Sequence, residues 1–235
     1  MNRPFFYIAN WKMYFSYQQT RSWLNEYLSD LSTLAKNNNI IICPSYTTLE
    51  YAAQACKKTH LLIGGQDCSS YAQGAHTGQI SALSLSEIGC NYCLIGHSEQ
   101  RSLVSNEEIE EKALRLIENN IIPILCISKS SPEQLQPALT VLSLYPSKEM
   151  LIAYEPIESI GTGTVPENGS IEEQFYAINA HLEYENIPKE SFYLLYGGSV
   201  NKTNATHLKI IDRLDGFLIG GASTRFDEFT QIIDA

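Results

Sequence analysis

The chain lacks long apolar runs and low-complexity stretches, and it has no excess of positive charge. None of its apolar runs approaches the roughly 20 residues that a membrane-spanning helix needs. The run F-F-Y-I-A near the start is too short for a secretion signal and is soon followed by Lys12. Lys and Arg number 16 against 26 Asp and Glu, a formal net charge of −10, which argues against nucleic-acid or anionic-membrane partners. We therefore expect a cytoplasmic protein without such partners.

A metal-binding or disulfide framework is also missing from the cysteine pattern. The chain has six cysteines, and a single C-x-x-C pair is not completed by a second pair of Cys or His. Most of these cysteines lie in or beside apolar runs, where a free thiol packs as a small hydrophobe. We expect reduced, buried thiols, as is usual in the cytoplasm. The six residues are Cys43, Cys56, Cys68, Cys90, Cys93 and Cys126.

Short apolar runs recur along the 235 residues, and none is separated from the next by a linker or a shift in composition. They are continuous rather than alternating, which is typical of parallel strands buried on both faces. We expect one domain over residues 1–235. The eight runs start at Phe5, Ile40, Leu61, Tyr92, Ile122, Leu151, Phe192 and Phe217.

Helical patterns lie between these runs. Ser105 begins S-N-E-E and Ser170 begins S-I-E-E, and each resembles a capping box at the start of a helix. Apolar residues follow both at helical spacing, and similar stripes begin at Trp23 and Phe226. Eight strand patterns that alternate with helices predict an α/β fold, a single (β/α)8 TIM barrel with parallel strands. A doubly wound open sheet is the alternative.

Polar residues follow several of the apolar runs, and in such a barrel the active site lies where the strands end. Asn10 and Lys12 follow the first run, His97 the fourth, Cys126 closes the fifth and Glu155 follows the sixth. The fold would therefore gather a lysine, a histidine and a glutamate on one face.

Glycine pairs follow the last two runs, at 197–198 and 220–221. Glycine lets a backbone N–H approach an anion without a Cβ in the way, and barrels often bind phosphate at these two loops. One such pair alone is more simply a tight turn. Two pairs after adjacent strands predict a phosphate site.

Glu155, His97 and Lys12 are candidates for acid–base chemistry. A carboxylate beside apolar neighbours is stripped of water and accepts protons more readily. The S-E-Q-R that follows His97 resembles a helix start, whose N-terminus would keep the imidazole neutral. Lys12 would attract an anion that the net charge repels. A surface carboxylate, a structural histidine and a solvated lysine are the ordinary alternatives, but the combination predicts proton abstraction beside a carbonyl on a small phosphorylated substrate.

Five motifs resemble the triosephosphate isomerase family in sequence and in order. The resemblance begins at residue 5 and runs nearly to the end of the chain. It implies a TIM barrel that interconverts dihydroxyacetone phosphate and D-glyceraldehyde 3-phosphate through an enediolate, in glycolysis and gluconeogenesis. It also implies that no cofactor and no metal take part. The motifs are N-W-K (Asn10–Lys12), G-H-S-E-Q-R (Gly96–Arg101), A-Y-E-P-I-E-S-I-G-T-G (Ala153–Gly163), Y-G-G-S-V (Tyr196–Val200) and G-F-L-I-G-G-A-S (Gly216–Ser223).

The resemblance also implies a role for each site residue. Glu155 is the base, His97 the neutral electrophile, and Asn10 and Lys12 bind the substrate. The phosphate is expected at Gly161, Ser199, Gly220 and Gly221. Three supporting residues, Ser98, Glu99 and Cys126, are expected to shape the resting site and to pack against the base.

A homodimer is implied as well. The stretch Ser70–Gln79 resembles the loop that enters the other subunit in this family, with Thr77 near the active site there. His76 and Gln79 replace a more typical aromatic residue and Glu in this loop.

The residues after Glu155 resemble the family's lid over the active site. Where most members have Trp, this chain has Glu158, and where most have Lys it has Thr164. A Pro-x-Glu hinge does occur in part of the family. Pro166 fixes a backbone dihedral, so we expect a stiffer second hinge. The lid residues are Pro156, Ile157, Glu158, Ile160, Gly161, Thr162, Gly163 and Thr164.

Two other functions stay open from the residues. One is a Schiff-base aldolase that uses Lys12 as its nucleophile. The other is a phosphate-binding protein without activity, which only the unusual lid residues Glu158 and Thr164 support.

Overall fold

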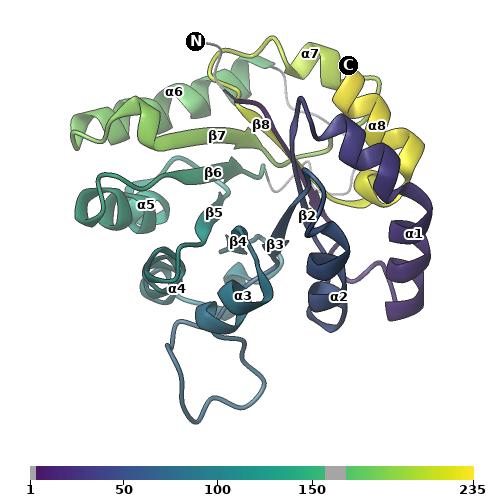
Figure 1. The fold of residues 1–235 in the computed structure, drawn as a ribbon. Coiled ribbons are helices and arrows are strands. Elements are labelled where there is room, and N and C mark those ends of the chain that lie inside the picture. Colours follow the sequence, from purple (N-terminus) through teal and green to yellow (C-terminus); the bar gives the residue numbers. More distant parts are fainter. Residues whose placement is uncertain (1–3, 157–167) are drawn as a thin grey trace.

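The computed structural model describes residues 4–156 and 168–235, and its centre is a closed barrel of eight parallel strands (Figure 1). Each strand pairs with its neighbours in sequence order, and β8 returns to pair with β1, where Phe6 lies opposite Gly216. The TIM-barrel prediction is confirmed, and the open-sheet alternative is wrong because the sheet has no free edge. The strands are β1 (Phe6–Asn10), β2 (Asn39–Cys43), β3 (Leu62–Gly65), β4 (Tyr92–Ile95), β5 (Ile122–Ile127), β6 (Met150–Tyr154), β7 (Phe192–Tyr196) and β8 (Gly216–Ile219).

Helices surround the barrel and cover its outer face (Figure 1). None of the helices in the described part of the chain combines the length and apolar character that a membrane crossing requires. The helices are α1 (Tyr17–Leu34), α2 (Tyr46–Cys56), α3 (Ala82–Ile88), α4 (Asn106–Glu118), α5 (Pro132–Leu144), α6 (Asn168–Tyr184), α7 (Ala205–Leu208) and α8 (Phe226–Asp234), and the short 3-10 segments are η1 (Arg101–Leu103), η3 (Lys189–Ser191) and η4 (Gly221–Thr224).

The two predicted capping boxes behave differently. Ser105 is the N-cap of α4, and its side chain accepts a hydrogen bond from the backbone N–H of Glu108. Ser170 instead lies inside α6, which begins at Asn168, so the predicted helix start was wrong. Asn and Gly also stand readily at helix starts, and an S-x-x-E pattern alone does not decide between neighbouring residues.

Alternate strand residues form two separate cores, one inside the barrel and one between the barrel and the helices. The inner core includes Ile8 on β1, Cys126 on β5 and Ala153 on β6. Two residues beyond Ile8 and Ala153 stand Asn10 and Glu155, which therefore point over the open end of the barrel interior. The period of two along the strands thus positions these polar side chains at the carboxyl ends of the strands, where barrel sites form.

All six cysteines are free and buried, which confirms the expectation of buried thiols. Burial raises the pKa of the Cys90 thiol to about 12, so this member of the C-x-x-C pair stays protonated and unreactive near neutral pH.

Candidate active site

A cavity of about 300 Å³ opens at the carboxyl ends of the strands. It brings together residues that follow five different strands and lie far apart in the sequence. Among the predicted site residues, its lining includes Asn10, Lys12, His97, Glu155, Ser199, Gly220 and Gly221. Its lining also includes Tyr14, which the sequence analysis did not single out.

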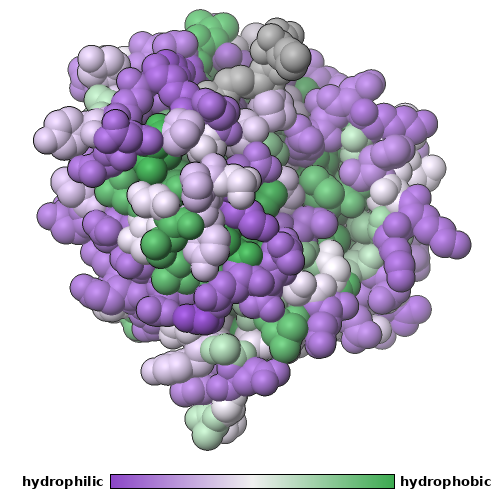
Figure 2. Space-filling view, turned by 60° about the vertical axis from the view of Figure 1, so that its left-hand side comes forward, coloured by the Kyte–Doolittle hydropathy of each residue, from purple (hydrophilic) through white to green (hydrophobic). Residues whose placement is uncertain are grey.

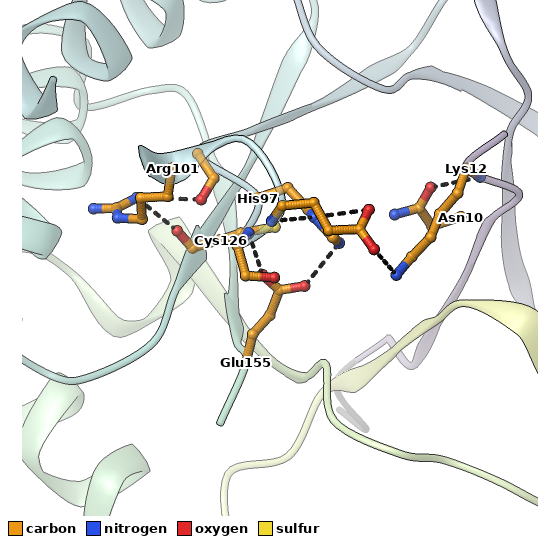
Figure 3. Close-up of polar contacts among 9 residues, drawn as sticks. Asn10, Lys12, His97, Arg101, Cys126 and Glu155 are labelled. Carbon is orange, nitrogen blue, oxygen red and sulfur yellow. Dashed lines mark hydrogen bonds and ion pairs between the residues drawn. The ribbon is translucent and has the colours of Figure 1, made fainter. Parts of the chain in front are cut away.

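Glu155 is almost completely buried, with 2% of its surface exposed. Its backbone N–H donates to the carbonyl of Ile127 at 2.7 Å, which extends the pairing of β6 with β5 by one residue. Its Oε1 lies 3.0 Å from His97 Nε2, and its Oε2 accepts a hydrogen bond from the Ser98 N–H at 3.0 Å (Figure 3). A Cβ on Gly197 would come within 2.9 Å of Glu155 Cγ, so glycine leaves the space that this carboxylate occupies.

His97 is held in one orientation by backbone contacts. Gly96, with φ of +67°, ends β4 and turns the chain so that the buried imidazole faces Glu155. The Glu99 N–H donates to His97 Nδ1 at 3.2 Å. Because Nδ1 accepts this bond, the neutral imidazole carries its proton on Nε2, the atom beside Glu155.

The predicted helix start after His97 was wrong. Residues 98–100 form a turn, and η1 follows as one short 3-10 segment. The backbone donor to the ring is therefore the Glu99 N–H of this turn and not the N-terminus of an α-helix. No α-helix starts at Ser98. The next α-helix starts after Ser105, whose side-chain oxygen caps it.

Lys12 lies across the cavity from Glu155, in the loop after β1 (Figure 3). Its backbone is left-handed, with φ of 43°, and its N–H donates to the Asn10 side-chain oxygen at 3.1 Å. Its Nζ forms an ion pair with Glu99 Oε1 at 2.7 Å. The other Glu99 oxygen lies 3.8 Å from His97 Nδ1. Glu99 therefore links the ammonium group to the histidine side of the site.

Cys126 lies directly behind this group, fully buried in the inner core. Burial, and next the charge of Glu155, raise the pKa of its thiol well above the usual range. The thiol is therefore a neutral neighbour of the carboxylate.

Residues 5–235 match the sequence pattern of a known family, which is described as triosephosphate isomerase. The chain belongs to the triosephosphate isomerase family. Full-length relatives agree, and all three compared here are named triosephosphate isomerase. They come from Nitrosomonas eutropha (33% identical over 99% of this chain and 98% of the relative), Aquifex aeolicus (34%, 96% of each) and Chlamydia muridarum (35%, 97% of this chain and 90% of the relative).

The family reaction is the interconversion of dihydroxyacetone phosphate and D-glyceraldehyde 3-phosphate, a step of glycolysis and gluconeogenesis. The chain is accordingly an aldose–ketose isomerase. The cavity contains side chains of the types that this chemistry requires, namely the buried carboxyl group of Glu155, the imidazole of His97 and the amine of Lys12.

The sequence analysis assigned no role to two half-buried residues beside the triosephosphate isomerase site, Gln66 and Arg101. Gln66, directly after β3, donates from its side-chain amide to the carbonyls of Lys12 at 2.8 Å and Cys43 at 2.9 Å. Arg101 donates from Nη1 to the carbonyls of Gly96 at 3.3 Å and Cys126 at 3.0 Å (Figure 3). The signal for Gln66 was its place after an apolar run, where the other site residues stand. Arg101 does not stand directly after an apolar run, so its place in the sequence did not indicate these contacts.

Other predicted residues of the isomerase lie apart from the cavity or outside the described residues. Thr77 is exposed on the segment between β3 and α3 and does not line the cavity. Pro156, the first predicted lid residue, is buried next to Glu155. Outside the described residues lie the predicted lid and phosphate residues Ile157, Glu158, Ile160, Gly161, Thr162, Gly163 and Thr164.

Proposed function

We propose that Glu155 is the base that moves the proton between the two carbons of the triose phosphate. Its carboxylate is buried, lines the cavity and can accept a proton from a substrate bound there. The base takes a proton from the carbon beside the carbonyl and returns it to the neighbouring carbon. The hydrogen bond from Ser98 N–H to Oε2 holds the unliganded carboxylate, which must leave this donor to reach the substrate carbon.

We propose that His97 is the neutral electrophile. Its Nε2–H can donate to the substrate oxygens as negative charge develops on them in the enediolate. The bond from Glu99 N–H to Nδ1 supports this assignment, because it fixes the tautomer that presents Nε2–H to the cavity. The observation that carries the proposal is a different contact: His97 Nε2 lies 3.0 Å from Glu155 Oε1, and both side chains line the same cavity.

The positive charge for an anionic substrate is assigned to Lys12, with Asn10 beside it. The chain carries a formal net charge of −10, so its overall field repels a phosphate ester. A cation inside the cavity reverses this repulsion locally. Glu99 is the counter-ion of Lys12 in the unliganded site, and the arriving substrate takes over part of that role.

The phosphate end is assigned to Ser199, Gly220 and Gly221, which line the cavity beside Lys12. A Cβ on Gly220 would lie 3.4 Å from the Lys12 side chain, so the ammonium group and this backbone share one side of the cavity. Gly161 and the lid stay part of the proposal on the strength of the sequence. A closed lid would exclude water from the enediolate.

The first experiment is a coupled assay of the wild-type chain with D-glyceraldehyde 3-phosphate. We expect turnover that follows saturation kinetics, needs no added cofactor or metal, and is inhibited competitively by inorganic phosphate. Binding of inorganic phosphate without any turnover would instead favour the inactive phosphate-binding protein that the unusual lid residues left open.

We also propose that the chain is a homodimer and works in the cytoplasm as a single domain over residues 1–235. The segment 70–79 projects from the lower end of the molecule, away from the barrel (Figures 1 and 2). It is largely exposed and includes Tyr71 and Thr77. Met13, next to Lys12, is 93% exposed, and a second copy would bury this apolar side chain.

A charged residue at position 13 tests the dimer. We expect a wild-type mass near twice 26.3 kDa in light scattering, and dissociation to monomers in Met13→Asp. The reason is that a carboxylate buried in an apolar contact must lose its hydration. Tyr184→Asp, on α6 and also highly exposed, is the matched control and should stay dimeric. A monomeric wild-type chain at micromolar concentration would contradict the proposal.

A further inference from the structure

Tyr14 lines the cavity at the end where Gly220 and Gly221 lie. The nearest side-chain atoms to the position that a Cβ on Gly221 would take are Tyr14 Oη at 3.6 Å, Cζ at 3.8 Å and Cε2 at 4.0 Å. The hydroxyl end of the ring, rather than its base, therefore stands against the glycine backbone. Lys12 stands in the same way against Gly220.

The backbone of this loop is fixed to the segment that carries the glycines. The Tyr14 N–H donates to the carbonyl of Trp11 at 3.0 Å, which closes a tight turn around Lys12. Trp11 is 1% exposed, and its indole N–H donates to the carbonyl of Ser223 in η4 at 3.3 Å. The position of Tyr14 relative to Gly221 therefore follows from buried contacts, although its side chain is 56% exposed.

The charged side chain near Gly220 and Gly221 is already paired, so a neutral hydrogen-bond donor is better placed to bind an anion there. Arg225 also lines the cavity, but its Nε donates to Glu228 Oε2 at 2.6 Å and its Nη1 donates to the carbonyl of Gly221 at 3.3 Å. Its charge is thus compensated by a carboxylate on the same wall. The Tyr14 hydroxyl has no hydrogen-bond partner among the described residues, and a phenol O–H is a good donor to an anionic oxygen.

We propose that Tyr14 is a substrate-binding residue of the isomerase, whose hydroxyl donates a hydrogen bond to an outer oxygen of the substrate phosphate. This inference rests on the proposed phosphate position at Gly220 and Gly221. The bond is the same in the bound substrate and in the transition state, because the phosphate takes no part in the proton transfer. Tyr14 therefore contributes to substrate affinity and not to the chemical step.

The test compares Tyr14→Phe with wild type on substrates with and without the phosphate. We expect KM for D-glyceraldehyde 3-phosphate and Ki for inorganic phosphate to rise about tenfold, the loss of one hydrogen bond to an anion, with kcat unchanged. For D-glyceraldehyde, which has no phosphate, kcat/KM should be unchanged, whereas a merely structural role of Tyr14 would lower it. Tyr17→Phe, an exposed tyrosine at the start of α1, is the matched control and should match wild type on both substrates.

The outcomes separate this inference from the proposed function. If the wild-type chain is active and Tyr14→Phe retains wild-type KM and Ki, Tyr14 does not bind the phosphate and only this inference is overturned. A loss of dimer in Tyr14→Phe with an unchanged Ki would equally overturn it and assign the ring to the subunit contact. A wild-type chain that shows no turnover and binds no inorganic phosphate would overturn the proposed function itself.

Discussion

Replacing Glu155 by Gln is expected to lower kcat by about 10²- to 10⁴-fold, the usual contribution of a positioned general base. The amide keeps the size of the side chain but cannot accept the substrate proton. It also fits the site poorly. If its oxygen faces the Ser98 N–H, its NH₂ group faces His97 Nε2–H, so two donors oppose each other. The imidazole cannot easily switch tautomer, because Glu99 N–H occupies Nδ1.

Glu155→Asp and a stability measurement complete this experiment. Asp keeps the charge but withdraws the carboxylate by one methylene, about 1 Å, and such a displacement can cost about 10²-fold in rate. Neither variant should unfold the barrel, because the side chain fills a cavity wall and not the apolar core, and thermal unfolding by circular dichroism checks this. Glu118→Gln, on the exposed side of α4, is the control carboxylate. Wild-type kcat in Glu155→Gln would remove the base assignment.

Much of the fold could be predicted because its local signals agree with its long-range packing. β5 and β7 occupy the residues of their apolar runs, and the other strands differ by one residue at one end or at both ends. Parallel strands covered on both faces are apolar throughout, so a run of apolar residues was sufficient evidence. Helix starts were less predictable, as Ser170 shows, because several neighbouring small polar residues can begin a helix and tertiary contacts choose between them.

The sequence predicted which side chains line the candidate site but not the hydrogen bonds that orient them. Asn10 is the last residue of β1 and Glu155 directly follows β6, so the period of two and the barrel topology together place them at one mouth of the barrel. The tautomer of His97 depends on one backbone N–H, and the conformation of Lys12 depends on contacts from a different loop. Gln66 and Tyr14 reach the site only once β3 and η4 pack beside the loop after β1. The hydrogen bonds that these residues form depend on packing between loops, which no local sequence pattern predicts.

Replacing Lys12 by Met is the second large effect, and we expect kcat/KM to fall by at least about 10²- to 10³-fold. The variant loses the cation that offsets the net charge of −10 and that stabilises the enediolate oxygens. It also leaves Glu99 without its ion-pair partner, 54% exposed at the edge of the site, where its charge repels the substrate. Steady-state kinetics at several ionic strengths measure both contributions.

Lys12→Arg is the matched variant, because it keeps the charge in the same left-handed backbone. Met and Arg would both adopt the same φ of 43° at this position. The difference in kcat/KM between the two variants therefore reports the effect of the charge and not of backbone strain. We expect Arg to retain part of the activity, limited by the shape of the guanidinium group. Lys148→Met, an exposed lysine bonded to Asn120, should have no effect. Equal activity of Lys12→Met and wild type would contradict the electrostatic role.

The same lysine decides between the isomerase and a Schiff-base aldolase. An imine requires the Lys12 amine to attack the carbonyl carbon, whereas Lys12 Nζ forms an ion pair with Glu99 Oε1 at 2.7 Å. Borohydride added with dihydroxyacetone phosphate should therefore leave the mass of the chain unchanged, while turnover continues in its absence. A reduced adduct on Lys12 would show that the amine, and not Glu155, starts the chemistry, since an imine at the carbonyl replaces the need for an oxyanion. The ion pair with Glu99 therefore favours the isomerase, in which Lys12 stabilises the enediolate by its charge and forms no covalent bond to the substrate.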